Sequence, residues 1–214
     1  DPVEYQLDGI SQVQVFDDIG LTFGSTLRSI LRQDPDVLLI GEIRDGETAD
    51  IAVKFSLTGH LVFSTVHAND APGTLTRLLD IGIAPFLVGS CLNLVMAQRL
   101  VRKLCAKCKE EHIPSTEELA LIGLTKKDVK SNLFKSKGCA DCRNTGYRGR
   151  TAIFEMIPMA RELRKLVFES ANEDEIRQAA IKNGMVTLRD AGNERVLDGT
   201  TSIEEILRST VEDL

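Results

Sequence analysis

With 214 residues, 43% of them hydrophobic and 27% charged, the chain has the composition of an ordinary globular protein that can bury a substantial core. No apolar run approaches the roughly 20 residues needed to cross a bilayer, and no signal-peptide pattern opens the chain, so we expect a cytoplasmic protein. The net charge of −6 is uneven, because residues 99–150 hold 13 basic and 6 acidic residues while both flanks are acidic. Such a basic segment can meet nucleic acid, anionic lipid or an acidic protein face, although a solvated surface is commoner. The opening "DPVEY", without an initiator Met, suggests a piece of a longer protein.

The first half of the chain predicts alternating helices and strands. The stretch "TFGSTLRSILRQ" predicts a helix capped near Thr22. The apolar run Val37–Ile40 is too short for a typical helix and has no polar interruption, which indicates a strand buried on both faces of a parallel sheet; the run from Leu61 to Val66 is similar. Between them, "GETADIAVKFSLTG" has helical spacing that ends at Gly59. We therefore predict a βαβ unit.

The rest of the chain predicts mainly helices. Helical spacing continues through "APGTLTRLLDIG" and "FLVGSCLNLVMAQRLVRKL", and the last third contains "PMARELRKLVFES", "EDEIRQAAIKNG" and "SIEEILRST". This order predicts an α/β fold in which helices are layered on a parallel sheet over residues 1–104. A cysteine-containing subdomain over residues 105–150 and a helical region over 151–214 would follow.

Polar side chains gather where the predicted strands end. Glu42 follows the first strand, and Ser64, Thr65 and His67 lie at the end of the second. Ligands of open parallel sheets bind beyond the carboxyl ends of the strands, and Glu4, near the end of a predicted opening strand, would face the same rim. Two carboxylates and a histidine suit a Mg²⁺-nucleotide reaction, in which one acid holds the metal and another orients or deprotonates water. Glu42 could instead have a purely structural role, in which it pairs with Arg44 or caps the next helix.

Three separated motifs carry a family resemblance. "DPVE", "DPDVLLIGEIRD" and "TGHLVFSTVHAND" resemble the Asp box, the Walker B segment and the His box of the hexameric ATPases of type II secretion and type IV pilus assembly, and the likeness continues through "TGYRGRTAIFE". The resemblance implies a RecA-like core and a Mg²⁺-dependent, ATP-hydrolysing motor that acts as a homo-hexamer. It also implies an inner-membrane platform protein as partner and a place at the inner membrane. The cysteine insertion accompanies assembly and secretion motors in this resemblance, rather than retraction motors.

The resemblance also implies roles for individual residues. Glu4 matches the glutamate that activates the attacking water, and Glu42 the one that supports Mg²⁺. His60 and His67 match His-box residues that couple the γ-phosphate to neighbouring groups, although His60, beside Gly59, also fits a simple turn hydrogen bond. The candidates for phosphate or subunit-interface contacts are four arginines: Arg28, Arg32, Arg44 and Arg77. A solvated helical stripe explains Arg28 and Arg32 equally well.

One expected motif is missing from this sequence. No G-x-x-x-x-G-K-[ST] occurs, although such a loop cradles the phosphates of a nucleotide in P-loop enzymes. In the family that loop precedes the Asp box. We therefore predict that this chain alone neither binds ATP tightly nor hydrolyses it.

Two C-x₂-C pairs predict a structural metal site. Cys105 and Cys108 form the first pair, Cys139 and Cys142 the second, with 30 residues between them. Four thiolates complete a tetrahedral Zn²⁺ site and leave no open position for catalysis. Structural disulfides are rare in cytosolic proteins, and two redox motifs in one chain would be unusual. Cys91 lies among apolar residues and fits a buried small side chain.

Two other functions compete with the motor interpretation. The basic segment and its cysteines would suit a zinc-containing nucleic-acid-binding module, but residues 99–150 contain Phe134 and Tyr147 as their only aromatic residues and have acidic flanks, so we expect no nucleic acid. A non-catalytic ring-assembly domain is the second alternative, favoured by the missing phosphate loop. The basic segment, including Lys126, Lys127 and Lys130, could instead face a protein partner or an anionic membrane.

Overall fold

The computed structural model describes residues 3–210, which form two compact units. The first unit runs up to Val95 and includes Pro158–Ala179; the second comprises Met96–Ile157 and the residues from Ala180 onwards. The mixed α/β fold predicted from the sequence is confirmed, whereas its division into three parts stays a prediction. No helix within the described range combines the length and the hydropathy that a membrane span requires.

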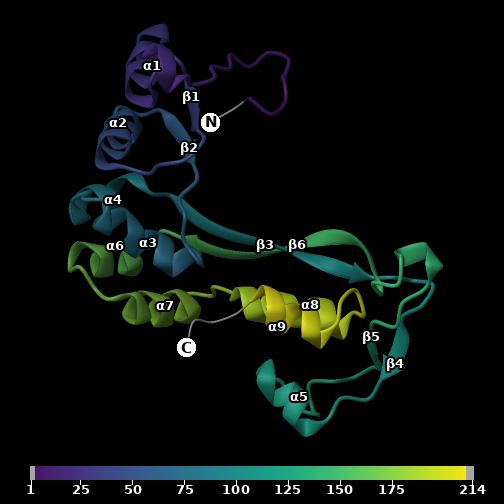
Figure 1. Cartoon of the computed structure of the whole chain (residues 1–214). Coiled ribbons are helices and arrows are strands. Elements are labelled where there is room, and N and C mark those ends of the chain that lie inside the picture. Colours follow the sequence, from purple (N-terminus) through teal and green to yellow (C-terminus); the bar gives the residue numbers. More distant parts are fainter. Residues whose placement is uncertain (1–2, 211–214) are drawn as a thin grey trace. The chain divides into compact units, whose positions relative to one another are not determined.

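The predicted βαβ unit is present in the first unit (Figure 1). Its elements are β1 (Val37–Ile40), α2 (Gly46–Leu57) and β2 (Leu61–Ser64). β1 and β2 are parallel, with Val37 opposite Leu61 and Ile40 opposite Ser64. Asp45 caps α2 and accepts a hydrogen bond from its first turn at 2.8 Å. Because the strands are parallel, their carboxyl ends lie at one edge.

The prediction that these strands are buried on both faces is wrong. Leu38 and Ile40 are buried, but the other face of the sheet exposes four apolar side chains to between 46% and 75%: Val37, Leu39, Leu61 and Phe63. Successive strand residues point to opposite faces, so each strand presents one covered and one uncovered row. An uninterrupted apolar run shows that both faces of a strand could be buried. Whether the second face is buried depends on another element that covers it.

Helices make up most of the rest of the first unit. They are α1 (Phe23–Ile30), α3 (Ala71–Asp80), α4 (Pro85–Cys91), α6 (Arg161–Phe168) and α7 (Glu173–Lys182), with 3₁₀ turns at Asp17–Ile19 and Leu31–Gln33. Thr22 caps α1, as predicted. The predicted opening strand, which would end near Glu4, falls partly on residues 1–2, outside the described residues; residues 3–15 contain no strand. A strand requires a neighbour, and β1 and β2 pair only with each other in the part of the chain that the structure describes.

A second correction concerns the stretch predicted as one long helix before the cysteines. α4 ends at Cys91, and Leu94–Leu104 forms β3, which pairs with β6 (Tyr147–Pro158). Val95, Ala97 and Val101 are buried while their neighbours are more exposed, so burial follows the two-residue period of a strand. The same apolar positions satisfy a helical period in part, and the pairing with β6 decides between the two.

The second unit also contains several short elements. β4 (Glu110–His112) and β5 (Leu133–Lys135) are antiparallel, and α5 (Thr116–Leu121) and the 3₁₀ turn Ala140–Cys142 lie in the same region. α8 (Leu188–Leu197) packs against α9 (Ile203–Ser209), in agreement with the helical character predicted for the C-terminal region. A Cβ at Gly192 would lie 2.9 Å from Ile206, so glycine permits the close approach of these helices.

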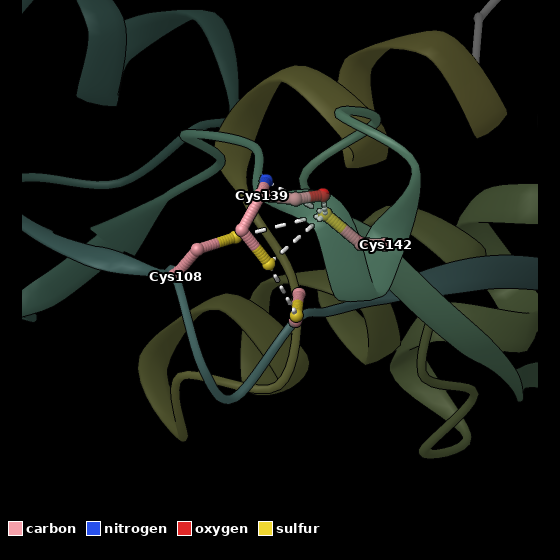
Figure 2. Close-up of side chains that lie close together, drawn as sticks. Cys108, Cys139 and Cys142 are labelled. Atoms are coloured by element: carbon pink, nitrogen blue, oxygen red, sulfur yellow. Dashed lines mark hydrogen bonds between the residues drawn. The ribbon is translucent and has the colours of Figure 1, made fainter.

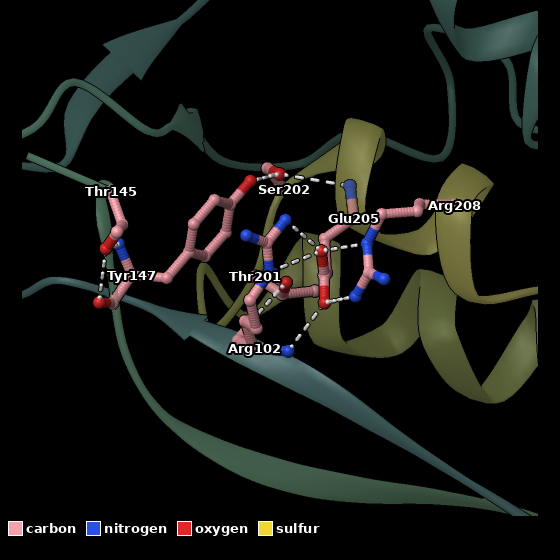
Figure 3. Close-up of polar contacts among 7 residues, drawn as sticks. All are labelled: Arg102, Thr145, Tyr147, Thr201, Ser202, Glu205 and Arg208. Carbon is pink, nitrogen blue, oxygen red and sulfur yellow. Dashed lines mark hydrogen bonds and ion pairs between the residues drawn. The ribbon is translucent and has the colours of Figure 1, made fainter.

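A buried ion network holds α9 to β3 (Figure 3). The Glu205 carboxylate is fully buried and accepts hydrogen bonds from the Arg102 backbone N–H at 2.9 Å and from the Arg102 guanidinium at 2.9 and 2.6 Å. Arg208 donates two more, at 3.0 and 2.7 Å. The Arg102 guanidinium lies 4.1 Å from the centre of the Tyr147 ring, whose hydroxyl lies 2.7 Å from the Ser202 hydroxyl. The network satisfies a buried charge from several sides, as a buried ion pair requires.

Candidate functional site

Glu42 lies immediately beyond the carboxyl end of β1, with His67 and Arg44 beside it. The Glu42 side chain is 11% exposed, and its Oε2 lies 2.8 Å from His67 Nε2. An ionised carboxylate can only accept a hydrogen bond, so this contact places a proton on His67 Nε2. Arg44 forms an ion pair with Glu42 Oε1. The contact with a histidine from the second strand and the plain ion pair with Arg44, both considered from the sequence, are therefore present.

The end of β2 is fastened to β1 beyond the last paired residues. The Ile43 backbone N–H donates to the Thr65 carbonyl at 2.9 Å, and the Thr65 hydroxyl donates to the Gly41 carbonyl at 2.6 Å. These bonds continue the parallel ladder and align the two strand ends. As a result, His67, two residues after Thr65, reaches Glu42 from the neighbouring strand.

A cavity of ≈ 400 Å³ opens next to Glu42. Its lining includes Thr22 and Phe23 at the start of α1, Asp45 at the start of α2, and both Glu42 and Arg44. Helix N-termini carry partial positive charge and backbone N–H groups. The volume falls within the range of about 300–1,000 Å³ that is usual for small-molecule sites. Glu42 and Arg44 thus line a space of the size of a small-molecule site.

Glu42 has the chemistry expected of a metal-supporting carboxylate. Its Oε1 is buried and has the Arg44 guanidinium as its ion-pair partner, and its Oε2 faces His67. Carboxylate oxygens are the protein ligands that Mg²⁺ prefers. Glu42 is the carboxylate of this site that would support a Mg²⁺ ion, directly or through water, and this role stays a prediction.

Neither Glu4 nor His60 has a hydrogen bond or ion pair with Glu42 among the described residues. Glu4 is exposed in the segment before α1, and within the described residues no hydrogen bond or ion pair joins it to Glu42, so convergence of the two carboxylates stays a prediction. His60 stacks on Phe55 with ring centres 3.9 Å apart, and its Nδ1 lies 2.9 Å from the Thr58 hydroxyl. It precedes β2 whereas His67 follows it. The observed contacts of His60 are those of the turn.

The four candidate arginines lie in different surroundings. Arg28 pairs with Glu47 at 2.6 Å, and Arg32 donates to the Ser29 hydroxyl at 3.3 Å. Arg77 is exposed in the last turn of α3. Arg44 is the candidate that the structure places against Glu42. Phosphate or subunit contacts of the other three stay predictions.

The four predicted cysteines meet in the second unit, and Figure 2 shows the sulfur atoms of Cys108, Cys139 and Cys142 turned toward one another. The Sγ atoms of Cys105 and Cys139 are 3.9 Å apart, those of Cys108 and Cys142 3.8 Å, and those of Cys139 and Cys142 3.7 Å. A tetrahedral Zn²⁺ with bonds of about 2.3 Å requires S–S separations of about 3.8 Å. The cluster therefore fits zinc in both ligand type and size.

Backbone N–H groups support the thiolate form of Cys142. Cys139 N–H and Gly146 N–H lie 3.2 and 3.3 Å from its sulfur. Burial alone raises the pKa of Cys142, but these donors outweigh it and bring the pKa to about 6. Burial and neighbouring thiols raise the pKa of Cys108 to about 12. A thiolate is therefore easier to form at Cys142 than at Cys108.

One contact near His67 is not predicted by any pattern in the sequence. Asp70 caps α3 by accepting from the Gly73 N–H at 2.8 Å, and Arg177 of α7 donates to it at 2.7 Å. The string "NDAPG" contains the cap signal, an aspartate followed by proline in the first turn. Arg177 is 107 residues away, and no local pattern connects it with this loop.

Comparison with known proteins identifies the family of the chain. A family model described as "Type II/IV secretion system protein" matches residues 1–208. The type IV pilus assembly ATPase PilB of Myxococcus xanthus is 51% identical over the whole chain, which covers 38% of that protein, and the type II secretion system protein E of Pseudomonas aeruginosa is 48% identical, with 42% of it covered. The chain thus spans about two fifths of these relatives.

Solved structures share the fold. The pilus retraction motor PilT with bound ADP has a TM-score of 0.61 at 23% identity, covering 90% of this chain and 44% of that one. The Legionella pneumophila ATPase DotB has a TM-score of 0.58 at 20% identity, with 86% and 41% covered. On the family match and the relatives together, the chain belongs to the family of type II/IV secretion system proteins.

Proposed function

We propose that this chain is part of a Mg²⁺-dependent ATPase motor that drives type IV pilus assembly or type II protein secretion. The observation that carries the proposal is the contact between Glu42 and His67 at adjacent strand ends, beside a polar cavity. Relatives at about 50% identity are a pilus assembly ATPase and a secretion protein. We also propose, from the family resemblance, a homo-hexameric ring at the cytoplasmic face of the inner membrane, bound to a platform protein.

Within this proposal each residue has a distinct task. Glu42 supports Mg²⁺, which neutralises phosphate charge and polarises the phosphoryl group when bound. His67 donates its Nε2 proton to Glu42 and would report the state of the γ-phosphate across that contact. Glu4 would orient the attacking water. Arg44, already against Glu42, is the first candidate among the arginines for a phosphate contact, because a guanidinium fork suits phosphate oxygens.

The cysteine cluster has a structural role in this proposal. Four thiolates fill the coordination sphere of Zn²⁺, so the ion would hold the loops around β4 and β5 together and take no part in catalysis. Lys109 lies next to the first cysteine pair and donates to the Gly199 carbonyl at 3.0 Å, after α8. The metal subdomain is thereby joined to the C-terminal helices.

Replacement of Glu42 by Gln in the full-length protein tests the catalytic proposal. The change preserves size but removes the negative charge, so ATP turnover should fall by about 100-fold or more. The matched control is Asp50→Asn, because Asp50 is an exposed carboxylate on α2 that pairs with Lys54 at 2.5 Å. It should alter turnover less than twofold. An E42Q protein as active as the control would contradict the proposal.

A second comparison tests whether this chain is sufficient. We expect ATP turnover from the full-length protein and none above background from residues 1–214 alone. Turnover by the shorter chain at the full-length rate would refute the prediction. Absence of turnover from both would favour the non-catalytic ring-assembly function instead.

A further inference from the structure

Two helices of the first unit meet at a group of charged side chains close to His67. Arg177 Nη2, on α7, donates to Asp70 Oδ2 and to Glu173 Oε1, both at 2.7 Å. The other Glu173 oxygen accepts from the Thr76 hydroxyl of α3 at 3.4 Å. α3 and α7 are therefore fastened at two points, and Arg177 is the cation at the centre.

The two oxygens of Asp70 hold two different elements. Oδ1 accepts from the Gly73 N–H and so caps α3, while Oδ2 accepts from Arg177. The Asp70 side chain is 19% exposed and that of Arg177 27%. A partly buried pair is screened by salt less than a surface pair. The position of the cap therefore depends on the arginine of α7.

Gly73 shows how closely the two carboxylates approach each other. A Cβ on this residue would lie 3.1 Å from Asp70 Oδ1 and 3.4 Å from Glu173 Oε2. Without Arg177, two negative charges would face each other around this point with no cation between them. Their repulsion would displace Asp70 or α7.

His67 would follow such a displacement because most of its ring is exposed to solvent. Its side chain is 86% exposed, and its contact with Glu42 depends on the backbone that carries it. That backbone is fixed on one side by Thr65, which bonds to Gly41, and on the other by Asp70. Residues 66–69 form the span between these two anchors.

We propose that Arg177 is a positioning residue for the reaction: by holding Asp70, it fixes the far end of the segment that presents His67 to Glu42. The inference rests on the proposed function of Glu42 and His67. Arg177 itself touches neither residue and acts through Asp70. Turnover should therefore depend on Arg177 only as long as His67 is present.

A double-mutant cycle in the full-length protein tests this dependence. Arg177→Gln should lower kcat on the order of tenfold, as expected for a small misplacement of a reacting group, and leave KM for ATP within twofold. When Arg177→Gln is added to His67→Ala, kcat should fall no further, because the residue that Arg177 positions is no longer present. Arg177→Lys should restore most of kcat, since a single nitrogen, Nη2, makes both observed contacts and an ammonium can replace it.

The controls separate positioning from general stability. Arg189→Gln removes hydrogen bonds to Thr210 at 2.7 Å and to the Leu121 carbonyl at 2.9 Å in the second unit. It should lower the melting temperature while keeping kcat. If R177Q does not fold, Asp70→Asn replaces it, because Asn still caps the helix but loses the ion pair.

The possible outcomes are distinct. If R177Q lowers kcat by the same factor in the wild-type protein and in the H67A protein, the positioning role is overturned and the proposed function stays intact. An H67A protein with unchanged kcat would remove the proposed role of His67, and the inference with it. Loss of kcat in R189Q equal to that in R177Q would show that the effect follows stability alone and would also overturn it.

Discussion

The charge of Glu205 should contribute measurably to the stability of the second unit. Burial raises the pKa of this carboxyl, but hydrogen bonds from Arg208 and Arg102 outweigh burial and lower the pKa from 4.5 to about 2. At about 1.4 kcal/mol per pH unit, that difference corresponds to about 3 kcal/mol. Because the pKa is lower in the folded state, the stabilisation is complete above about pH 5 and is lost as the pH falls toward 2.

Glu205→Gln tests this linkage. At pH 7 the variant should lose about 3 kcal/mol of unfolding free energy, within the range for breaking a buried pair. At pH 3 the gap to the wild type should narrow by about 2 kcal/mol, because the Glu205 carboxyl of the unfolded wild type, with its ordinary pKa of 4.5, then binds a proton while the folded carboxyl stays mostly ionised. Guanidinium chloride unfolding followed by circular dichroism at both pH values measures the gap. Glu204→Gln, on the exposed side of the same helix, should change stability by less than about 0.5 kcal/mol. If the difference in unfolding free energy between the wild type and E205Q is the same at both pH values, the proposed linkage is refuted.

Two further predictions concern the metal cluster and the basic segment. Metal analysis of the purified protein should find one zinc ion per chain. Cys142→Ser should lose the zinc, whereas the control Cys91→Ser should keep it. Stoichiometric zinc in C142S would exclude a four-cysteine site. Charge reversal of Lys126, Lys127 and Lys130 should weaken binding to vesicles of anionic lipid on the order of 100-fold, at about 1 kcal/mol per lysine. The control reverses three exposed lysines elsewhere, Lys54, Lys165 and Lys182, with the same change in net charge. Equal binding by both variants and the wild type would count against a membrane role, and a salt-dependent shift with DNA or RNA would support the nucleic-acid alternative.

Several parts of the fold were predictable because their causes are local. The cap at Thr22 and the stop near Gly59 depend on a few neighbouring residues, and they place the start of α1 and the end of α2 as predicted. The C-x₂-C spacing likewise brings two sulfur atoms together within one turn. The meeting of the two pairs followed from the preference of zinc for four ligands, and the sulfur separations fit it.

The candidate site was predictable in part. The carboxyl ends of parallel neighbours lie at one edge, so Glu42 and His67 could be expected near each other. Glu4 was assigned by resemblance and by a strand that is absent among residues 3–15. Arg177 could not be found, because its partner Asp70 is distant in sequence and only the packing of α7 on α3 brings the two together.

By itself, the sequence determined where helices begin, which runs are apolar, and which residues can bind metal or phosphate, since these depend on side-chain chemistry and short spacing. Tertiary structure alone decided that Leu94–Leu104 is a strand rather than a continued helix, because its partner β6 lies more than 40 residues away. It also decided that one face of β1 and β2 remains exposed, because burial depends on a covering layer and not on the strand's own composition.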